Sequence, residues 1–170
     1  MIGYKLFRTV KGELRPLYVY ADKTIPIGEW LEAEPGPMKD GKVVSRLGLL
    51  AYRPGWHIST VPYVEHIYTV HEGIRCQKKG TVWCEVEYHD FSYQSIADEH
   101  GIHNDKFVAR DACLKYVPKG GYYMYKTSPA MFGEWAIAGE MKVLKVLTDE
   151  EVDEICTYHG IKSQPRIETE

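Results

Sequence analysis

A histidine and a serine stand two positions apart, His57 and Ser59, directly after the Pro54-Gly55 turn signal. On a strand, alternate side chains share a face, so we expect the imidazole and the hydroxyl to lie side by side. Such a pair binds a phosphate or a sugar hydroxyl, or the histidine acts as a general base, since its ordinary pKa lies near ~6.5. The alternative is a His-Ser pair that holds a loop in place by hydrogen bonds.

A carboxylate, Glu134, opens a strand expected over residues 134–138 and shares its face with Ala136 and Ala138. Small neighbours leave room for a ligand beside the carboxylate. It would accept hydrogen bonds from ribose hydroxyls or stabilise a developing cation. The alternative is an edge-strand glutamate that discourages aggregation.

Arg8 lies in the first expected strand, where alternation places it on an apolar face with Leu6 and Val10. A cation in such a place requires an acidic partner or a bound anion. Both outcomes stay open: an anion site or a structural salt bridge.

The sequence carries no recognised metal or nucleotide-hydrolase signature. His57, His66 and His71 match no zinc spacing, and no CxxC pair accompanies them, so we expect no metal. Walker, GxGxxG, HExxH and GxSxG motifs are absent, which argues against the common enzyme classes that use them.

Composition indicates a folded protein without a strong electrostatic preference. The chain has 170 residues, 44% of them hydrophobic, and a formal net charge of −3. It therefore has no broad attraction to nucleic acid or anionic membrane. We expect a cytoplasmic protein with no membrane association, because neither a leader peptide nor a membrane-length apolar run is seen.

Thirteen tyrosines and four tryptophans against four phenylalanines suit half-buried sheet faces and ligand clefts. The four widely spaced cysteines are expected to be reduced thiols.

Periodicity predicts an α+β fold, mainly antiparallel sheet with a few helices. One helix is strongly marked, because Thr148 and Glu151 form a capping box and Gly160 ends the helix. We expect one domain over residues 1–161, a surface loop at 34–41 and a flexible tail at 162–170. The expected strands are Tyr4–Val10 with Leu17–Tyr20 as its hairpin partner, Thr81–Asp90, Gly121–Thr127, Glu134–Ala138 and Lys142–Leu147, and the further expected helices are Pro62–Thr69 and Asp105–Tyr116.

The order of these segments resembles short phage and prophage proteins of undefined function. The resemblance covers most of the chain and rests on GYKLFR at residues 3–8, RPGWH at 53–57, and GEWAIAG at 133–139 followed by KVLKVLTDEEV. It implies action in the cytoplasm of a host cell. A host protein or a nucleic acid would then be the target.

A looser resemblance is to ADP-ribosyltransferases, which use NAD. In this resemblance Arg8 would hold the NAD phosphates or ribose, Ser59 would order the site, and Glu134 would stabilise the oxocarbenium-like centre. Thr60, Tyr63 and His66 would be further contacts to NAD, and His57 would join Glu134 and Ser59 as a catalytic residue. The sequence departs from that family at Val61, where a serine is usual, and at Phe132, where a second acidic residue would favour arginine as the acceptor.

Two hypotheses follow. The first is an ADP-ribosyltransferase-like effector that modifies a host macromolecule. The second is a non-catalytic binding protein that sequesters a nucleotide signal or inhibits a host defence protein. Convergence of Arg8, Ser59 and Glu134 on one aromatic-lined cleft favours the enzyme, and scatter of these residues favours the binder.

Overall fold

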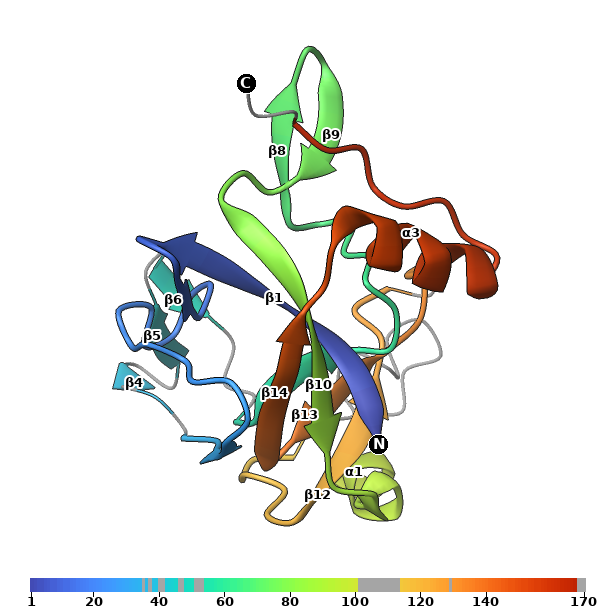
Figure 1. Ribbon diagram of the computed structural model, residues 1–170. Coiled ribbons are helices and arrows are strands. Elements are labelled where there is room, and N and C mark those ends of the chain that lie inside the picture. The colour runs from blue at the N-terminus through green and yellow to red at the C-terminus, as the bar shows by residue number, and fades with distance from the viewer. Residues whose placement is uncertain are drawn as a thin grey trace.

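The computed structural model describes residues 1–34, 36, 38–39, 42–45, 48–50, 54–100, 114–128 and 130–167. The largest part of the fold is one twisted sheet in the order β11-β12-β13-β7-β1-β10-β14-β3, and β2 pairs with β1 (Figure 1). All neighbours are antiparallel except β11 and β12. The strands are β1 (Ile2–Val10), β2 (Glu13–Arg15), β3 (Trp30–Glu32), β7 (Trp56–Ser59), β10 (Thr81–Tyr88), β11 (Phe91–Ser92), β12 (Gly121–Tyr125), β13 (Trp135–Ala138) and β14 (Glu140–Val146).

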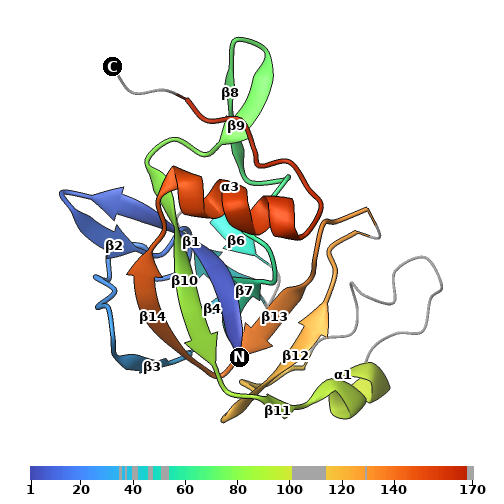
Figure 2. The same ribbon diagram turned by 45° about the vertical axis from the view of Figure 1, so that its right-hand side comes forward.

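Two smaller sheets and two helices complete the described part. The strands β4 (Met38–Lys39), β5 (Lys42–Ser45) and β6 (Gly48–Leu50) form one small sheet. The hairpin of β8 (Tyr68–His71) and β9 (Ile74–Gln77) projects away from the main sheet (Figure 2). The helices are α1 (Gln94–His100) and α3 (Asp149–Tyr158). The predicted strand-rich α+β class is confirmed at this level. No helix among the described residues is long and apolar enough to cross a membrane.

The main sheet is apolar on both faces, which explains its two cores. In β10, Cys84, Val86 and Tyr88 are buried on one face, whereas Trp83 is buried on the other. Period-two alternation of this kind places successive side chains on opposite faces of a strand. Helix α3 covers the Trp83 face through Val152 and Cys156, which pack in the same cluster (Figure 2).

The predicted capping box is present at the start of α3. The Thr148 hydroxyl accepts a hydrogen bond from the Glu151 backbone N–H, and the Glu151 carboxylate accepts one from the Thr148 N–H, each at 3.1 Å. These bonds satisfy donors that a helix start leaves unpaired. The same carboxylate binds Lys145 at the end of β14, so the cap also ties the helix to the sheet.

Two predicted elements differ in the structure. The hairpin partner of β1 is β2, and Leu17–Tyr20 is a loop, because Pro16 has no N–H to continue the ladder and Tyr20 has a positive φ of 51°. The predicted helix at Pro62–Thr69 is wrong. The amide of Gln164 binds both the N–H and the carbonyl of Val64, so this backbone cannot make helical bonds there. The helix expected at Asp105–Tyr116 falls mostly outside the described residues.

The end of the chain also differs from the flexible tail expected at 162–170. Gln164 is 8% exposed, Pro165 accepts a hydrogen bond from the Gln77 N–H, and Arg166 pairs with Asp149 and Asp153. Residues 164–166 are therefore held against the rest of the chain by side-chain and backbone contacts that the composition of the segment does not show. Residues 168–170 lie outside the described part.

Candidate functional site

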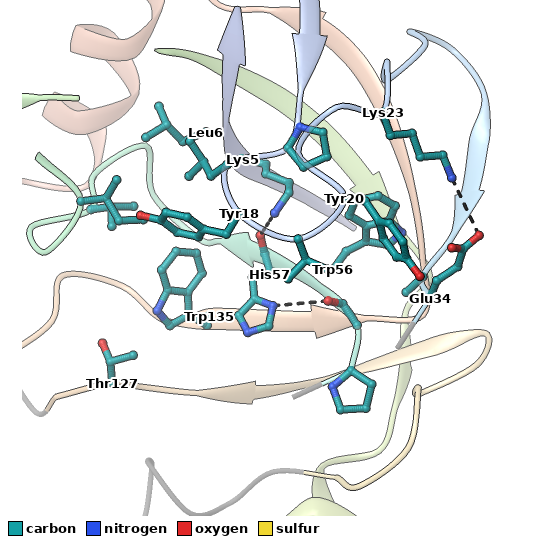
Figure 3. Close-up of a pocket in the computed structure, with 18 of the residues that line it drawn as sticks. Lys5, Leu6, Tyr18, Tyr20, Lys23, Glu34, Trp56, His57, Thr127 and Trp135 are labelled. Atoms are coloured by element: carbon teal, nitrogen blue, oxygen red, sulfur yellow. Dashed lines mark hydrogen bonds and ion pairs between the residues drawn. The ribbon is translucent and has the colours of Figure 1, made fainter. Parts of the chain in front are cut away.

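A cavity opens where the main sheet separates between β1 and β7. These strands are paired at one position only, Tyr4 with Ser59. Beyond that pair a cavity of about 460 Å³ lies between the strands and the 16–20 loop (Figure 3). This volume falls within the range of small-molecule sites.

The turn before β7 depends on Gly55. Its φ is +138°, and a Cβ there would lie 2.5 Å from the Ile137 side chain and 3.2 Å from the Ala138 carbonyl oxygen. Only glycine permits this close approach without displacing β13. The turn sets the entry of β7 and therefore the position of Trp56 and His57 in the cavity wall.

Aromatic rings make up much of the wall. They come from the 16–20 loop and from β7, β12 and β13, and they include Tyr18, Tyr20, Trp56, His57, Tyr125 and Trp135. The His57 ring meets the rings of Tyr125 and Trp135 edge to face, with centroids 6.3 and 6.1 Å away. Walls of this kind bind flat, partly apolar ligands.

Two lysines line the described cavity wall, Lys23 and Lys5, and Lys5 comes from β1. Its Nζ donates a hydrogen bond to the His57 carbonyl oxygen at 2.8 Å and lies 5.9 Å from the Trp56 ring centroid (Figure 3). Burial lowers the pKa of this amine from 10.5 to about 8. No carboxylate pairs with it among the described residues; Glu34, which also lines the cavity, pairs with Lys23 at 3.8 Å. An anion is the partner that this cation lacks.

Two histidines flank Trp135 in the wall. His57 Nδ1 lies 3.3 Å from the Gly55 carbonyl oxygen, a hydrogen bond when Nδ1 carries the proton. His66 meets the Trp135 ring edge to face at 6.1 Å. Burial lowers the pKa of His66, and the nearby Glu65 partly opposes that change. Neutral His66 can accept or donate a hydrogen bond to a ligand near pH 7.

Trp135 lines the cavity, and its indole N–H is enclosed by protein without a hydrogen-bond partner in the described structure. Its side chain is 7% exposed, and the buried Nε1 has no hydrogen-bond partner among the described residues. In Figure 3 the indole nitrogen points toward Thr127, which also lines the cavity. A buried N–H without an acceptor costs stability, so Trp135 is an unfavourable point in the cavity wall.

Of the predicted site residues, His57 and His66 line this cavity. Tyr63 lies with His66 in a neighbouring pocket of about 280 Å³. Thr60 has a structural contact, because its Oγ1 accepts a hydrogen bond from the Glu134 N–H at 2.8 Å.

Ser59 and Arg8 are engaged elsewhere. Ser59 is fully buried, and its hydroxyl donates to the Val61 carbonyl oxygen. Arg8 donates from Nε to the Pro16 carbonyl oxygen at 3.1 Å and from a terminal nitrogen to the Ala21 carbonyl oxygen. Arg8 therefore holds the 16–21 loop, and its partners are carbonyl oxygens instead of the carboxylate or anion expected from sequence.

Glu134 lies outside both pockets. The room expected beside it is filled, because Ala136 and Ala138 are fully buried in the core against Phe7 and Ile58. Arg8, Ser59 and Glu134 thus do not converge on one aromatic-lined cleft. The small side chains of Ala136 and Ala138 allow close packing in this core, and they do not leave space for a ligand beside Glu134.

Lys5 and the aromatic loop were not predicted as site residues. Lys5 stands between Tyr4 and Leu6 in β1 and shares a face with Phe7. The reasoning applied to Arg8, that a cation on an apolar face needs an anionic partner, applies equally to Lys5. The loop at 16–20 carried no signal, since it was expected to be a strand.

The thiols and the metal-binding side chains offer no second site in the described part. Cys76, Cys84 and Cys156 are free and buried, and burial raises the pKa of Cys84 to about 12. A thiol with so high a pKa is a poor nucleophile near pH 7. The described residues contain no cluster of three metal-ligating side chains. Cys113 lies outside them.

Comparison with protein-family models, with curated proteins and with solved structures finds no match to this chain.

Proposed function

We propose that this chain is a binding protein for a small anionic ligand with a flat ring, and that the ligand occupies the cavity between β1 and β7. The observation that carries the proposal is the Lys5 ammonium, which lies in an aromatic-walled cavity without a carboxylate partner among the described residues. A cation so placed favours an anion, and the rings favour stacking.

Nucleotides combine these two features. The phosphate would pair with Lys5, and the base would lie against the Trp56 or Tyr18 ring. Hydroxyl and amide-like groups of the ligand would meet His57 or His66. The proposal therefore follows the second sequence hypothesis, in which the chain sequesters a nucleotide signal in the cytoplasm of a host cell.

The ADP-ribosyltransferase hypothesis remains an alternative with less support. Its three key residues, Arg8, Ser59 and Glu134, lie outside the cavity, and two of them have side-chain partners in the backbone. NAD itself has rings and phosphates, so it stays among the ligands to be tested. Binding of NAD without turnover would be consistent with the proposal.

The test is calorimetric titration of the protein with AMP, GMP, ATP and NAD, repeated with Lys5→Met and Lys79→Met. Lys79 lies exposed on a turn away from the cavity and serves as the matched control. We expect Lys5→Met to weaken binding about tenfold to a hundredfold, because a charge-assisted hydrogen bond is worth ~1.5–3 kcal/mol. Lys79→Met should leave the affinity unchanged. Absence of binding by every probe, or equal binding by both variants, would refute the proposal.

A further inference from the structure

We infer that the ligand is an extended, two-ringed anion of the dinucleotide class, which crosses from the cavity at Lys5 into the neighbouring pocket at Arg75. This inference rests on the proposed function and narrows its ligand class. Three features of the described residues carry it: shared walls, a donor at the junction and a second cation with aromatic neighbours.

The two hollows adjoin each other. Val64, His66 and Thr127 line both of them. The second pocket, at about 280 Å³, is below the range of sites that hold a whole drug-sized ligand, which begins near ~300 Å³. It is better suited to one part of a larger molecule whose other part lies in the first cavity.

The junction holds polar groups that a ligand would satisfy. The unpaired Trp135 Nε1 points toward Thr127 (Figure 3), and the His66 ring, which lines both hollows, meets the Trp135 ring edge to face. The indole N–H is enclosed by protein, so an acceptor oxygen such as a bridging phosphate or ribose oxygen would reach this donor when the side chains at the junction move apart. A single ring confined to the Lys5 end would leave that donor unpaired.

The second pocket repeats the chemistry of the first. Arg75 lines it, and in the described part of the chain no carboxylate pairs with that guanidinium, which lies 4.5 Å from the Tyr68 ring centroid. Tyr63 and Phe132 add two rings, 5.1 Å apart and edge to face. Glu65 also lines this pocket and would accept from the exocyclic amine of a base. A second phosphate and a second base fit these groups.

The experiment compares AMP with the linear dinucleotide pApA on the full chain, using wild type, Arg75→Met and Lys79→Met. Linking two binding elements raises affinity strongly, so we expect pApA to bind at least ~100-fold more tightly than AMP. Arg75→Met should weaken pApA by roughly tenfold and leave AMP unchanged, since AMP occupies the Lys5 end. Arg75 is exposed, so its replacement should not affect folding. Lys79→Met should bind both probes as the wild type does.

A third variant, Trp135→Phe, removes the junction donor. It should weaken pApA by up to ~10-fold, with a melting temperature measured alongside to confirm folding. Equal affinity for AMP and pApA, with no effect of Arg75→Met, would overturn the two-pocket inference while leaving the proposed function intact. Failure of both probes to bind would count against the nucleotide proposal itself and against this inference with it.

Discussion

Lys5 is the residue whose protonation should control ligand binding. Its pKa is lowered to about 8, so the ammonium is present below that pH and is lost as the pH rises through it. A phosphate monoester changes little in charge over this range, because its second pKa lies near ~6. We expect affinity for AMP to fall above pH 8, approaching about tenfold per pH unit. Titrations from pH 7 to 10 check this, and Lys5→Met should show no such dependence.

The same pKa change has a defined effect on folding. Between about pH 8 and 10.5 the unfolded chain keeps a proton on Lys5 that the folded chain has lost. The unfolded state then binds more protons, so stability rises with pH in this window relative to Lys5→Met. Binding and stability should therefore change in opposite directions above pH 8. This opposition separates a ligand-binding lysine from one that only supports the fold.

Glu134 provides the test between the two sequence hypotheses. Because its side chain lies outside both pockets, we expect Glu134→Gln to bind AMP and NAD as the wild type does. The ADP-ribosyltransferase hypothesis instead predicts a loss of on the order of 100-fold to 1,000-fold in NAD consumption. Measuring NAD hydrolysis and binding together for both proteins decides between them. Turnover in the wild type that Glu134→Gln abolishes would restore the enzyme hypothesis.

At the scale of elements, the turn at Gly55 carries a testable cost. Alanine there would meet Ile137 and the Ala138 backbone, and the φ of +138° is unfavourable for a side chain. We expect Gly55→Ala to lower the free energy of unfolding by about 2–3 kcal/mol in urea titrations. Gly80→Ala is the control, since Gly80 also has a positive φ, +77°, but no atom lies near the added Cβ. That control should cost about 1 kcal/mol. Equal costs for both variants would contradict the close-approach argument.

Elements with strong local signals were predictable, and those fixed by tertiary contacts were not. The alternation of β10 and the capping box at Thr148 are local patterns, and both appear in the structure. The helix expected after Pro62 was wrong because Gln164, about a hundred residues away, binds that backbone. The candidate site was likewise predictable only where short sequence patterns mark its residues. His57 was predictable from its neighbours, whereas the cavity depends on how far β1 separates from β7, which no short segment encodes.

At the scale of the whole molecule, the two cores bury two of the three described cysteines. Cys84 packs on one face of the main sheet, Cys156 lies on the buried side of α3 against the other face, and Cys76 belongs to the projecting hairpin. All three are at most 4% exposed and free. Since no described disulfide supports the fold, its stability must come from packing of the sheet faces.

The thiols therefore report on the integrity of both cores. We expect the melting temperature to be unchanged by dithiothreitol. In the native protein, N-ethylmaleimide should label Cys84 and Cys156 at least ~100-fold more slowly than in urea, because labelling requires an opening whose free energy approaches that of global unfolding. Burial also raises the pKa of both thiols, which reduces the reactive thiolate. Peptide mapping by mass spectrometry gives each site its own rate, with the urea-unfolded chain as the reference.

Cys76 should label faster than Cys84, since a two-stranded hairpin opens more readily than the centre of a nine-stranded sheet. Rapid native labelling of Cys84, or a melting temperature lowered by reductant, would contradict this account of how the sheet is held together.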